Sequence, residues 1–252
     1  MSITTDEELL GMQRVSVAVA ETLRLMREYT RSGISASDLD YYGGTILKQY
    51  GAQSAPKKAY KFPGNTCISV NHEIAHGIPS SSKVLNEGDI INIDVSAELN
   101  SFWSDNGCSF IVGEDSRQLS PVVNVSRNIL LKALDHISHG VLISDIGYLI
   151  ETEARMAGFK VIRNLAGHGI GRKLHEYPEY ILNFRDTGNK DRFRKNMVVA
   201  LETFISTRSS YAITQDDGWT LAGNKGGFVA QHEHTIVVTS TSPLILTAQN
   251  GI

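Results

Sequence analysis

The stretch Asn92–Gly107, NIDVSAELNSFWSDNG, decides the expected fold because it places two acidic residues inside apolar, β-prone sequence. A two-residue turn at Leu99 and Asn100 predicts a hairpin in which Asp94 lies directly opposite Asp105. Directly opposed residues in a hairpin have Cβ atoms roughly 4.5–5.5 Å apart. Two carboxylates at that spacing repel one another inside a sheet, so they require a shared proton, a basic partner or a metal ion. The hairpin alone leaves these three explanations open.

Bulk composition bounds the class of protein. A chain of 252 residues suits one large domain or two fused halves. Its 24 basic and 27 acidic residues, with a net charge of −3, give no electrostatic reason to expect a nucleic acid or a membrane surface as partner. The apolar runs are too short to span a bilayer. The acidic start MSITTDEELLGMQ predicts no signal or transit peptide, and Cys67 and Cys108 form no CxxC pair, so we expect a reducing, cytoplasmic location.

Helical patterns alternate with strand-like segments along the chain. Apolar residues recur at helical spacing over residues 5–29, where Thr5 and Glu8 predict a capping box. A second helix is expected from Ser35 to Tyr50, and residues 52–65, which contain two prolines, are expected to be irregular. A further helical pattern covers residues 119–139.

Five positions at helix boundaries recur at a constant offset. They are Gly33, Ser37, Asp38, Leu39 and Gly51, which return as Gly140, Ser144, Asp145, Ile146 and Gly158. This predicts one domain, residues 1–252, made of two halves of like topology, about 1–115 and 116–252, each with two helices and then strands.

Two later strands also carry isolated glutamates, Glu202 in MVVALETFIS and Glu233 in GFVAQHEHTIVVT. His168 lies between two glycines in a predicted loop at a strand end. A salt bridge or a hydrogen bond could explain any single carboxylate, but all four together need buried lysines or arginines, which these strands lack. A dinuclear metal site explains the four acids and the imidazole jointly. Ligands that are mostly carboxylates with one nitrogen favour Mn, Fe or Co, and zinc stays open.

A site of this kind is typical of a hydrolase, because a pair of divalent ions lowers the pKa of a bound water and polarises a carbonyl or phosphoryl oxygen. His76 and His175 lie near these elements in the sequence. They are either surface or supporting histidines, or donors of hydrogen bonds to a developing oxyanion and a leaving group.

Over nearly its whole length the chain resembles the type I, bacterial methionine aminopeptidases. The motifs that carry the resemblance are TCISVN, AHGIP, GDIINIDVSA, the Asp105 segment, GHGIGRKLHE, the Glu202 strand and QHEHT. The short segment between Glu202 and Glu233 favours type I over type II. The resemblance implies an α+β pita-bread fold: two pseudo-symmetric halves, a central curved antiparallel sheet, and helices packed on its outer face.

The resemblance also implies the site. Two divalent ions (Co, Mn, Fe or Zn) are expected to be bound by five residues, of which Asp105 and Glu233 bridge both ions: Asp94, Asp105, His168, Glu202 and Glu233. Glu202 is expected to act as general base, and His175 and His76 to contact the scissile carbonyl and amide. Cys67, Phe62 and Trp219 are expected to line an apolar pocket for the methionine side chain.

The implied function is removal of the initiator methionine from nascent polypeptides whose second residue is small, by a cytoplasmic monomer that associates transiently with the ribosome. Several residues depart from the family pattern. Glu202 is followed by Thr203 in place of the usual proline, and Asp105 by Asn106 in place of the usual threonine. Pro56, Ala59 and Leu174 differ in the pocket, and Arg194-Lys-Asn196 lacks the usual turn. Because no departure replaces a ligand, we expect metal binding to survive, while the rate and the side-chain preference shift.

Other assignments are weaker. AGHGIG lacks the spacing of a dinucleotide-binding loop and Pro178 follows it, and HEYPE lacks the second histidine of HExxH. A proline-specific aminopeptidase or dipeptidase of the same fold is the nearest rival enzyme, although such enzymes usually carry an extra N-terminal domain. A binding module that has lost catalysis is the rival from another class, but such modules generally lose ligands that are all present here.

Overall fold

The computed structural model describes all residues of the chain, 1–252. Its α-helices include the two that begin the chain and the two that follow the central hairpin. They are α1 (Asp6–Tyr29), α2 (Ala36–Gln49), α3 (Ala55–Tyr60), α4 (Ser120–Asp135) and α5 (Ile143–Met156), followed near the C-terminus by a 3-10 turn, η1 (Ala248–Asn250).

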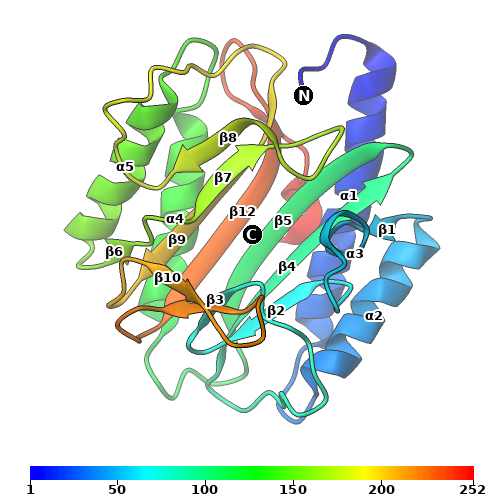
Figure 1. The fold of residues 1–252 in the computed structure, drawn as a ribbon, viewed down its shortest axis with the longest axis vertical. Helices are drawn as coiled ribbons and strands as arrows, with labels where there is room; N and C mark the ends of the chain where they lie inside the picture. The colour runs from blue at the N-terminus through cyan, green and yellow to red at the C-terminus, as the bar shows by residue number, and fades with distance from the viewer.

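Most strands join one antiparallel sheet of ten strands, with the main order β1-β4-β5-β12-β9-β7-β8 (Figure 1). Outside that order, β2 pairs with β4, β6 with β9, and β13 with β12. A second sheet has the order β10-β11-β3. The strands are β1 (Gln53–Ser54), β2 (Cys67–Val70), β3 (Glu73–Ala75), β4 (Ile90–Leu99), β5 (Phe102–Ile111), β6 (Lys160–Val161), β7 (Ala166–Gly169), β8 (Glu176–Leu182), β9 (Val198–Ser206), β10 (Ala212–Thr214), β11 (Leu221–Gly223), β12 (Val229–Val237) and β13 (Leu244–Ile245).

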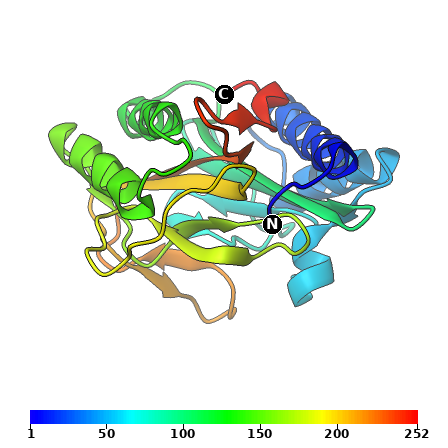
Figure 2. The ribbon, with the colours of Figure 1, turned by 90° about the horizontal axis from the view of Figure 1, so that it is seen from above.

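The four long helices cover one face of the large sheet, and the small sheet and α3 lie on its other side (Figure 2). This arrangement confirms the expected α+β class with a central antiparallel sheet. None of the helices combines the length and the apolar character that crossing a membrane would require.

Side-chain alternation along the strands separates the two faces. In β4, Ile91, Ile93 and Val95 belong to the core cluster that packs with α1 and α2. Asp94 lies between them in sequence, so its side chain points to the face opposite the helices. In β12, Ile236 belongs to the core cluster that packs with α4 and α5, and Glu233 by parity points away from it. Apolar packing therefore fixes which face receives the acidic side chains.

The hairpin of β4 and β5 has a different register from the predicted one. Its turn residues are Asn100 and Ser101, both at positive φ (52° and 66°), which is the signature of a type I′ turn. Leucine resists positive φ, and this moves the turn one residue beyond the predicted position. Asp94 consequently pairs with Gly107, and Asp105 with Ser96. The two aspartates are diagonal neighbours rather than directly opposed, but the shift of two residues keeps both on one face.

Two local expectations also need correction. The Thr5 hydroxyl accepts the Glu8 amide as predicted, at 3.2 Å, but the Glu8 carboxylate accepts hydrogen bonds from Thr4 instead of returning to Thr5. The region expected to be irregular contains β1 and the short helix α3. Ser54 caps α3, and Pro56 fits its first turn because a proline there loses no helical hydrogen bond.

A buried polar network ties α4 to β9 and β12. The hydroxyls of Ser126 and Thr203 lie 3.0 Å apart, and the Thr203 hydroxyl donates to the Ser126 carbonyl at 3.2 Å. The Ser126 hydroxyl also lies 3.0 Å from Nδ1 of His232 and 3.1 Å from the Ala230 carbonyl. Ser126 and Thr203 are fully buried, and His232 is nearly so. Thr203 thus supplies a hydroxyl that a proline at this position could not supply.

We predict that Ser101→Gly stabilises the protein by about 0.5–1 kcal/mol. Glycine adopts positive φ without the steric penalty of a Cβ, and this gain exceeds the added entropy of the unfolded chain. Urea unfolding monitored by circular dichroism measures the change, and Ser101→Val is the matched variant, which should destabilise. Equal stability of the glycine and valine variants would contradict the type I′ assignment.

We predict that Thr203→Val destabilises the protein by about 1–2 kcal/mol, because it keeps the shape of the side chain and removes a buried hydroxyl from a connected network. The same unfolding experiment measures this loss. Thr187→Val, at an exposed loop position, is the control and should stay within about 0.5 kcal/mol of the wild type. A Thr203→Val protein as stable as the wild type would show that the network contributes nothing.

Candidate metal centre

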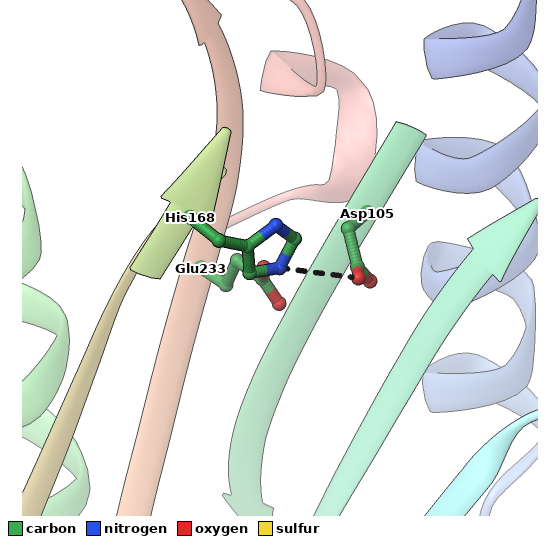
Figure 3. Close-up of side chains that lie close together, drawn as sticks. All are labelled: Asp105, His168 and Glu233. Carbon is green, nitrogen blue, oxygen red and sulfur yellow. Dashed lines mark ion pairs between the residues drawn. The ribbon is translucent and has the colours of Figure 1, made fainter. Parts of the chain in front are cut away.

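Three predicted ligands form a compact buried cluster. Asp105 on β5, His168 on β7 and Glu233 on β12 each offer one ligand atom, and these atoms lie within 4.8 Å of one another (Figure 3). Nε2 of His168 lies 3.9 Å from Oδ2 of Asp105. All three side chains are at least nine-tenths buried. Strands far apart in the chain therefore converge on one point.

The other two predicted ligands flank this cluster without belonging to it. Glu202 lies directly across from Glu233 in the pairing of β9 with β12. Asp94 lies on β4, the strand next to β5, and is paired on its other side with Cys67 of β2. Both carboxylates line the same cavity as the cluster. The structure therefore brings all five predicted ligands to one cavity, and three of them have ligand atoms within 4.8 Å of one another.

Burial dominates the electrostatics of the four carboxyl groups. For the chain alone, burial raises the pKa of Asp94 to about 6, opposed by a hydrogen bond with Asp105. Burial, and then the charges of Glu233 and Asp94, raises the pKa of Asp105 well above its ordinary value. The pKa values of Glu202 and Glu233 are raised well above normal for the same reasons, burial first and neighbouring carboxylates second. No lysine or arginine forms an ion pair with any of the four.

His168 lies within strand β7 rather than in the predicted loop. Flanking glycines let β7 approach its neighbours closely: a Cβ on Gly167 would lie 2.5 Å from the Ala200 carbonyl oxygen, and one on Gly169 would lie 2.2 Å from that of Tyr177. Nδ1 of His168 lies 3.0 Å from the Gly169 carbonyl and must donate to it. Burial lowers the pKa of His168 to about 3, so the imidazole is neutral and Nε2 keeps its lone pair.

Gln231 orients two of the acids, although it is not among the site residues predicted from the sequence. Its side-chain amide donates to Glu233 at 3.1 Å and to Glu202 at 3.3 Å. The oxygen of the same side-chain amide accepts a hydrogen bond of 2.7 Å from the side chain of Asn92. Its spacing in the sequence could have identified it, because residues two apart in a strand point to the same face, and Gln231 is two residues from Glu233. Hydrogen bonds of this kind hold ligand carboxylates in place.

Asn106, which replaces the threonine usual in the family, lies next to Asp105 on β5 and supports it from the backbone. Thr235 bonds both the amide and the carbonyl of Asp105, at 3.0 and 2.7 Å. The Asn106 amide donates to the Asp105 carboxylate at 2.9 Å. The Asn106 side chain points to the helix side, where its oxygen accepts from Asn250 at 2.8 Å and its nitrogen has no partner. The substitution therefore changes the supporting layer beneath Asp105 rather than the cavity.

The cavity has a volume of about 600 Å³, which suits a small ligand or a peptide end. The three residues predicted to receive the methionine side chain line it. Phe62 and Trp219 pack edge to face with ring centroids 5.3 Å apart, and Cys67, which lines the same cavity, is buried. Burial raises the pKa of the Cys67 thiol well above normal, so the thiol stays uncharged and forms a polarisable part of the cavity lining. The departures Pro56 and Leu174 also line this cavity, whereas Ala59 is exposed and does not, so its expected place in the pocket is wrong.

His76 and His175 both line the cavity. The His175 ring lies 4.1 Å from that of His168, centroid to centroid. Desolvation by surrounding protein lowers the pKa of both His76 and His175, although both residues are exposed at the surface of the chain. A second missed residue, Tyr60, places its hydroxyl 2.6 Å from Nδ1 of His175. No pattern in the sequence marked Tyr60, because it lies in the region expected to be irregular.

The residues present fit divalent metal ions. Four carboxylates share a buried space without a basic partner, and the one imidazole among them has its lone pair free. Isolated charges in such a space require compensation, and oxygen and imidazole ligands without sulfur suit hard or borderline divalent ions. Asp105, His168 and Glu233 are the residues placed to hold such an ion.

Comparison with known proteins agrees with this geometry. The chain is 45% identical to methionine aminopeptidase 2 of Bacillus subtilis, with 98% of this chain and 99% of that protein covered. A crystal structure of methionine aminopeptidase from Thermotoga maritima matches with a TM-score of 0.93 and 35% identity, over 98% of this chain and 99% of that one. Prolidase from Pyrococcus furiosus matches with a TM-score of 0.77 at 20% identity, over 97% of this chain and 65% of that one, and this likeness shows the fold alone.

A family model, metallopeptidase family M24, matches residues 11–240. That range contains every residue of the buried cluster and almost the whole of the large sheet. The chain therefore belongs to metallopeptidase family M24, and it has the pita-bread fold.

Proposed function

We propose that the protein is a metal-dependent aminopeptidase that removes the N-terminal methionine from polypeptides whose second residue is small. The observation that carries this proposal is the buried cluster of carboxylates and one imidazole that opens into an apolar cavity of about 600 Å³. The names of the two relatives more than 30% identical over nearly the whole chain support it.

Two divalent ions, Co, Mn, Fe or Zn, complete the proposed site. Asp94, Asp105, His168, Glu202 and Glu233 would hold them. When bound, the ions would lower the pKa of the attacking water and polarise the scissile carbonyl. The chain's own contribution is to hold the ligands from five strands in fixed positions and to exclude water from the cluster.

Glu202 is proposed to be the general base. It lies beside Glu233, and the Gln231 amide fixes its carboxylate so that one oxygen remains available to take a proton. His76 and His175 are proposed to donate hydrogen bonds to the scissile amide and carbonyl. Their lowered pKa values keep both imidazoles neutral near pH 7, and a neutral imidazole still has one N–H to donate.

Phe62, Cys67 and Trp219 are proposed to receive the methionine side chain. These side chains are two aromatic rings and a thiol, and the thioether of methionine makes favourable contacts with aromatic rings and with sulfur. The departures at Pro56 and Leu174 change the shape of this pocket, so they are proposed to shift the side-chain preference.

The proposal includes the setting of the activity. The chain is proposed to form a single catalytic domain of two halves, about residues 1–115 and 116–252, and to act as a cytoplasmic monomer. Its substrates would be the N-termini of nascent polypeptides, met through transient association with the ribosome, with no nucleic acid or membrane as a binding partner.

We predict that the purified protein supplied with Mn, Co, Fe or Zn hydrolyses Met-Ala-Ser and leaves the Leu-Ala-Ser analogue nearly intact. Tripeptide turnover followed by chromatography measures this preference. Turnover of Xaa-Pro peptides in place of Met-Ala-Ser would assign the protein to the proline-specific branch of the fold. Absence of turnover with every metal would favour a binding module.

We predict that Glu202→Gln lowers kcat for Met-Ala-Ser by at least about 100-fold, because glutamine cannot accept the proton. Steady-state kinetics measures the loss, and Glu28→Gln on the exposed side of α1 is the control with unchanged kcat. Full activity of Glu202→Gln would show that the assigned base is wrong.

We predict that a divalent ion at about 100 times its Kd stabilises the chelator-treated protein by about 2.7 kcal/mol, which corresponds to a rise of about 5–10 °C in Tm. The ion binds the folded cluster and compensates its buried carboxylates. Glu233→Gln should lose most of this rise in differential scanning fluorimetry, and His76→Ala, which removes no ligand, should keep it. An unchanged rise in Glu233→Gln would remove Glu233 from the ligand set.

A further inference from the structure

Tyr60 makes a direct contact with one of the two histidines that line the cavity. Its hydroxyl lies 2.6 Å from Nδ1 of His175, and the two rings are tilted with centroids 5.8 Å apart. Tyr60 itself lines the cavity but is not one of the predicted ligands or pocket residues. This short contact gives His175 a partner on the nitrogen opposite Nε2.

The short helix that carries Tyr60 is fixed at both ends. The Ser54 hydroxyl accepts the Lys57 amide at the start of α3 and donates to the Asn65 carbonyl at 2.7 Å. Asn65 is itself held by the buried carboxylate of Asp40, which accepts its amide and its side chain at 3.0 and 2.9 Å. Lys61 ends the helix in the left-handed conformation, at φ 60°. Hydrogen bonds therefore hold in place the short helix that carries Tyr60.

The chemistry of the two groups allows the Tyr60 hydroxyl to be the donor in this hydrogen bond. Partial burial and the charge of Asp105 raise the pKa of the Tyr60 hydroxyl, which consequently keeps its proton. Nδ1 of an uncharged imidazole can act as a hydrogen-bond acceptor, and the Tyr60 hydroxyl lies 2.6 Å from it. When the hydroxyl donates to Nδ1, the ring proton of the neutral imidazole resides on Nε2.

We propose that Tyr60 is a positioning residue: its hydroxyl donates to Nδ1 of His175 and holds the imidazole in the Nε2–H tautomer and in one ring orientation. This rests on the proposed function, in which His175 donates a hydrogen bond to the scissile carbonyl. Such a donor acts best when it is aligned before the oxyanion forms, because no reorganisation is then needed during the reaction. The opposite tautomer would present a lone pair to the carbonyl oxygen and repel it.

Nitrogen NMR of histidine-labelled, metal-free protein tests the hydrogen bond independently of any activity. His175→Asn identifies the His175 signals. We expect a one-bond N–H coupling at Nε2 and, at Nδ1, the chemical shift of an acceptor that receives a hydrogen bond. Tyr60→Phe should move the Nδ1 shift toward that of a free acceptor, whereas Tyr41→Phe, at an exposed position on α2, should not. A coupling at Nδ1, or no response to Tyr60→Phe, would overturn the proposal.

Kinetics with Met-Ala-Ser tests the consequence for the reaction. Tyr60→Phe should lower kcat about tenfold and leave KM within about twofold, because the hydrogen bond aligns a group that acts in the transition state. Tyr41→Phe should match the wild type in both constants. An unchanged kcat in Tyr60→Phe would overturn the positioning role. Lack of wild-type turnover with every metal would instead refute the proposed function, and the NMR result would still decide whether Tyr60 sets the tautomer.

Discussion

Compensation of buried negative charge is the constraint on which the rest of the structure depends. Four carboxylates project from one face of a sheet, and no basic side chain pairs with them. Folding without counter-charges forces their pKa values upward, so in the chain alone part of the charge is removed by protons. Bound cations remove the same repulsion and leave the carboxylates ionised. The strands, the flanking glycines of His168 and the amide of Gln231 all serve to keep these groups close despite that repulsion.

Much of the fold could be predicted from local sequence. Helix caps and apolar periodicity predicted α1 and α2 to within one or two residues, and isolated acids in apolar strands predicted a shared site. The register of the central hairpin could not be predicted as well, because it depends on which residues accept positive φ, and the prediction had placed Leu99 there in place of Ser101. The prediction that Asp94 and Asp105 share a face of the sheet still holds, because a register shift of two residues does not change the face to which a side chain points.

The missed residues, Gln231 and Tyr60, share a physical cause. Each acts through a partner that is remote in sequence or that lies in a segment without periodic pattern, so no local signal identifies it. Side-chain hydrogen bonds such as those from Gln231 to Glu202 and from Tyr60 to His175 are set by tertiary packing. The departures at Thr203 and Asn106 also gain their meaning only from packing, because both point to the helix side, where polar groups from α4 and the C-terminal segment meet them.

The strand order of the large sheet has a consequence for when the site can exist. β12 follows nearly all other strands in the chain, yet it lies between β5 and β9. It therefore joins the strands of the first half to those of the second, and it carries Glu233. Until this late strand inserts, Asp105 and His168 have no sheet connecting them. The complete set of ligands therefore exists only in chains in which β12 occupies its place between β5 and β9.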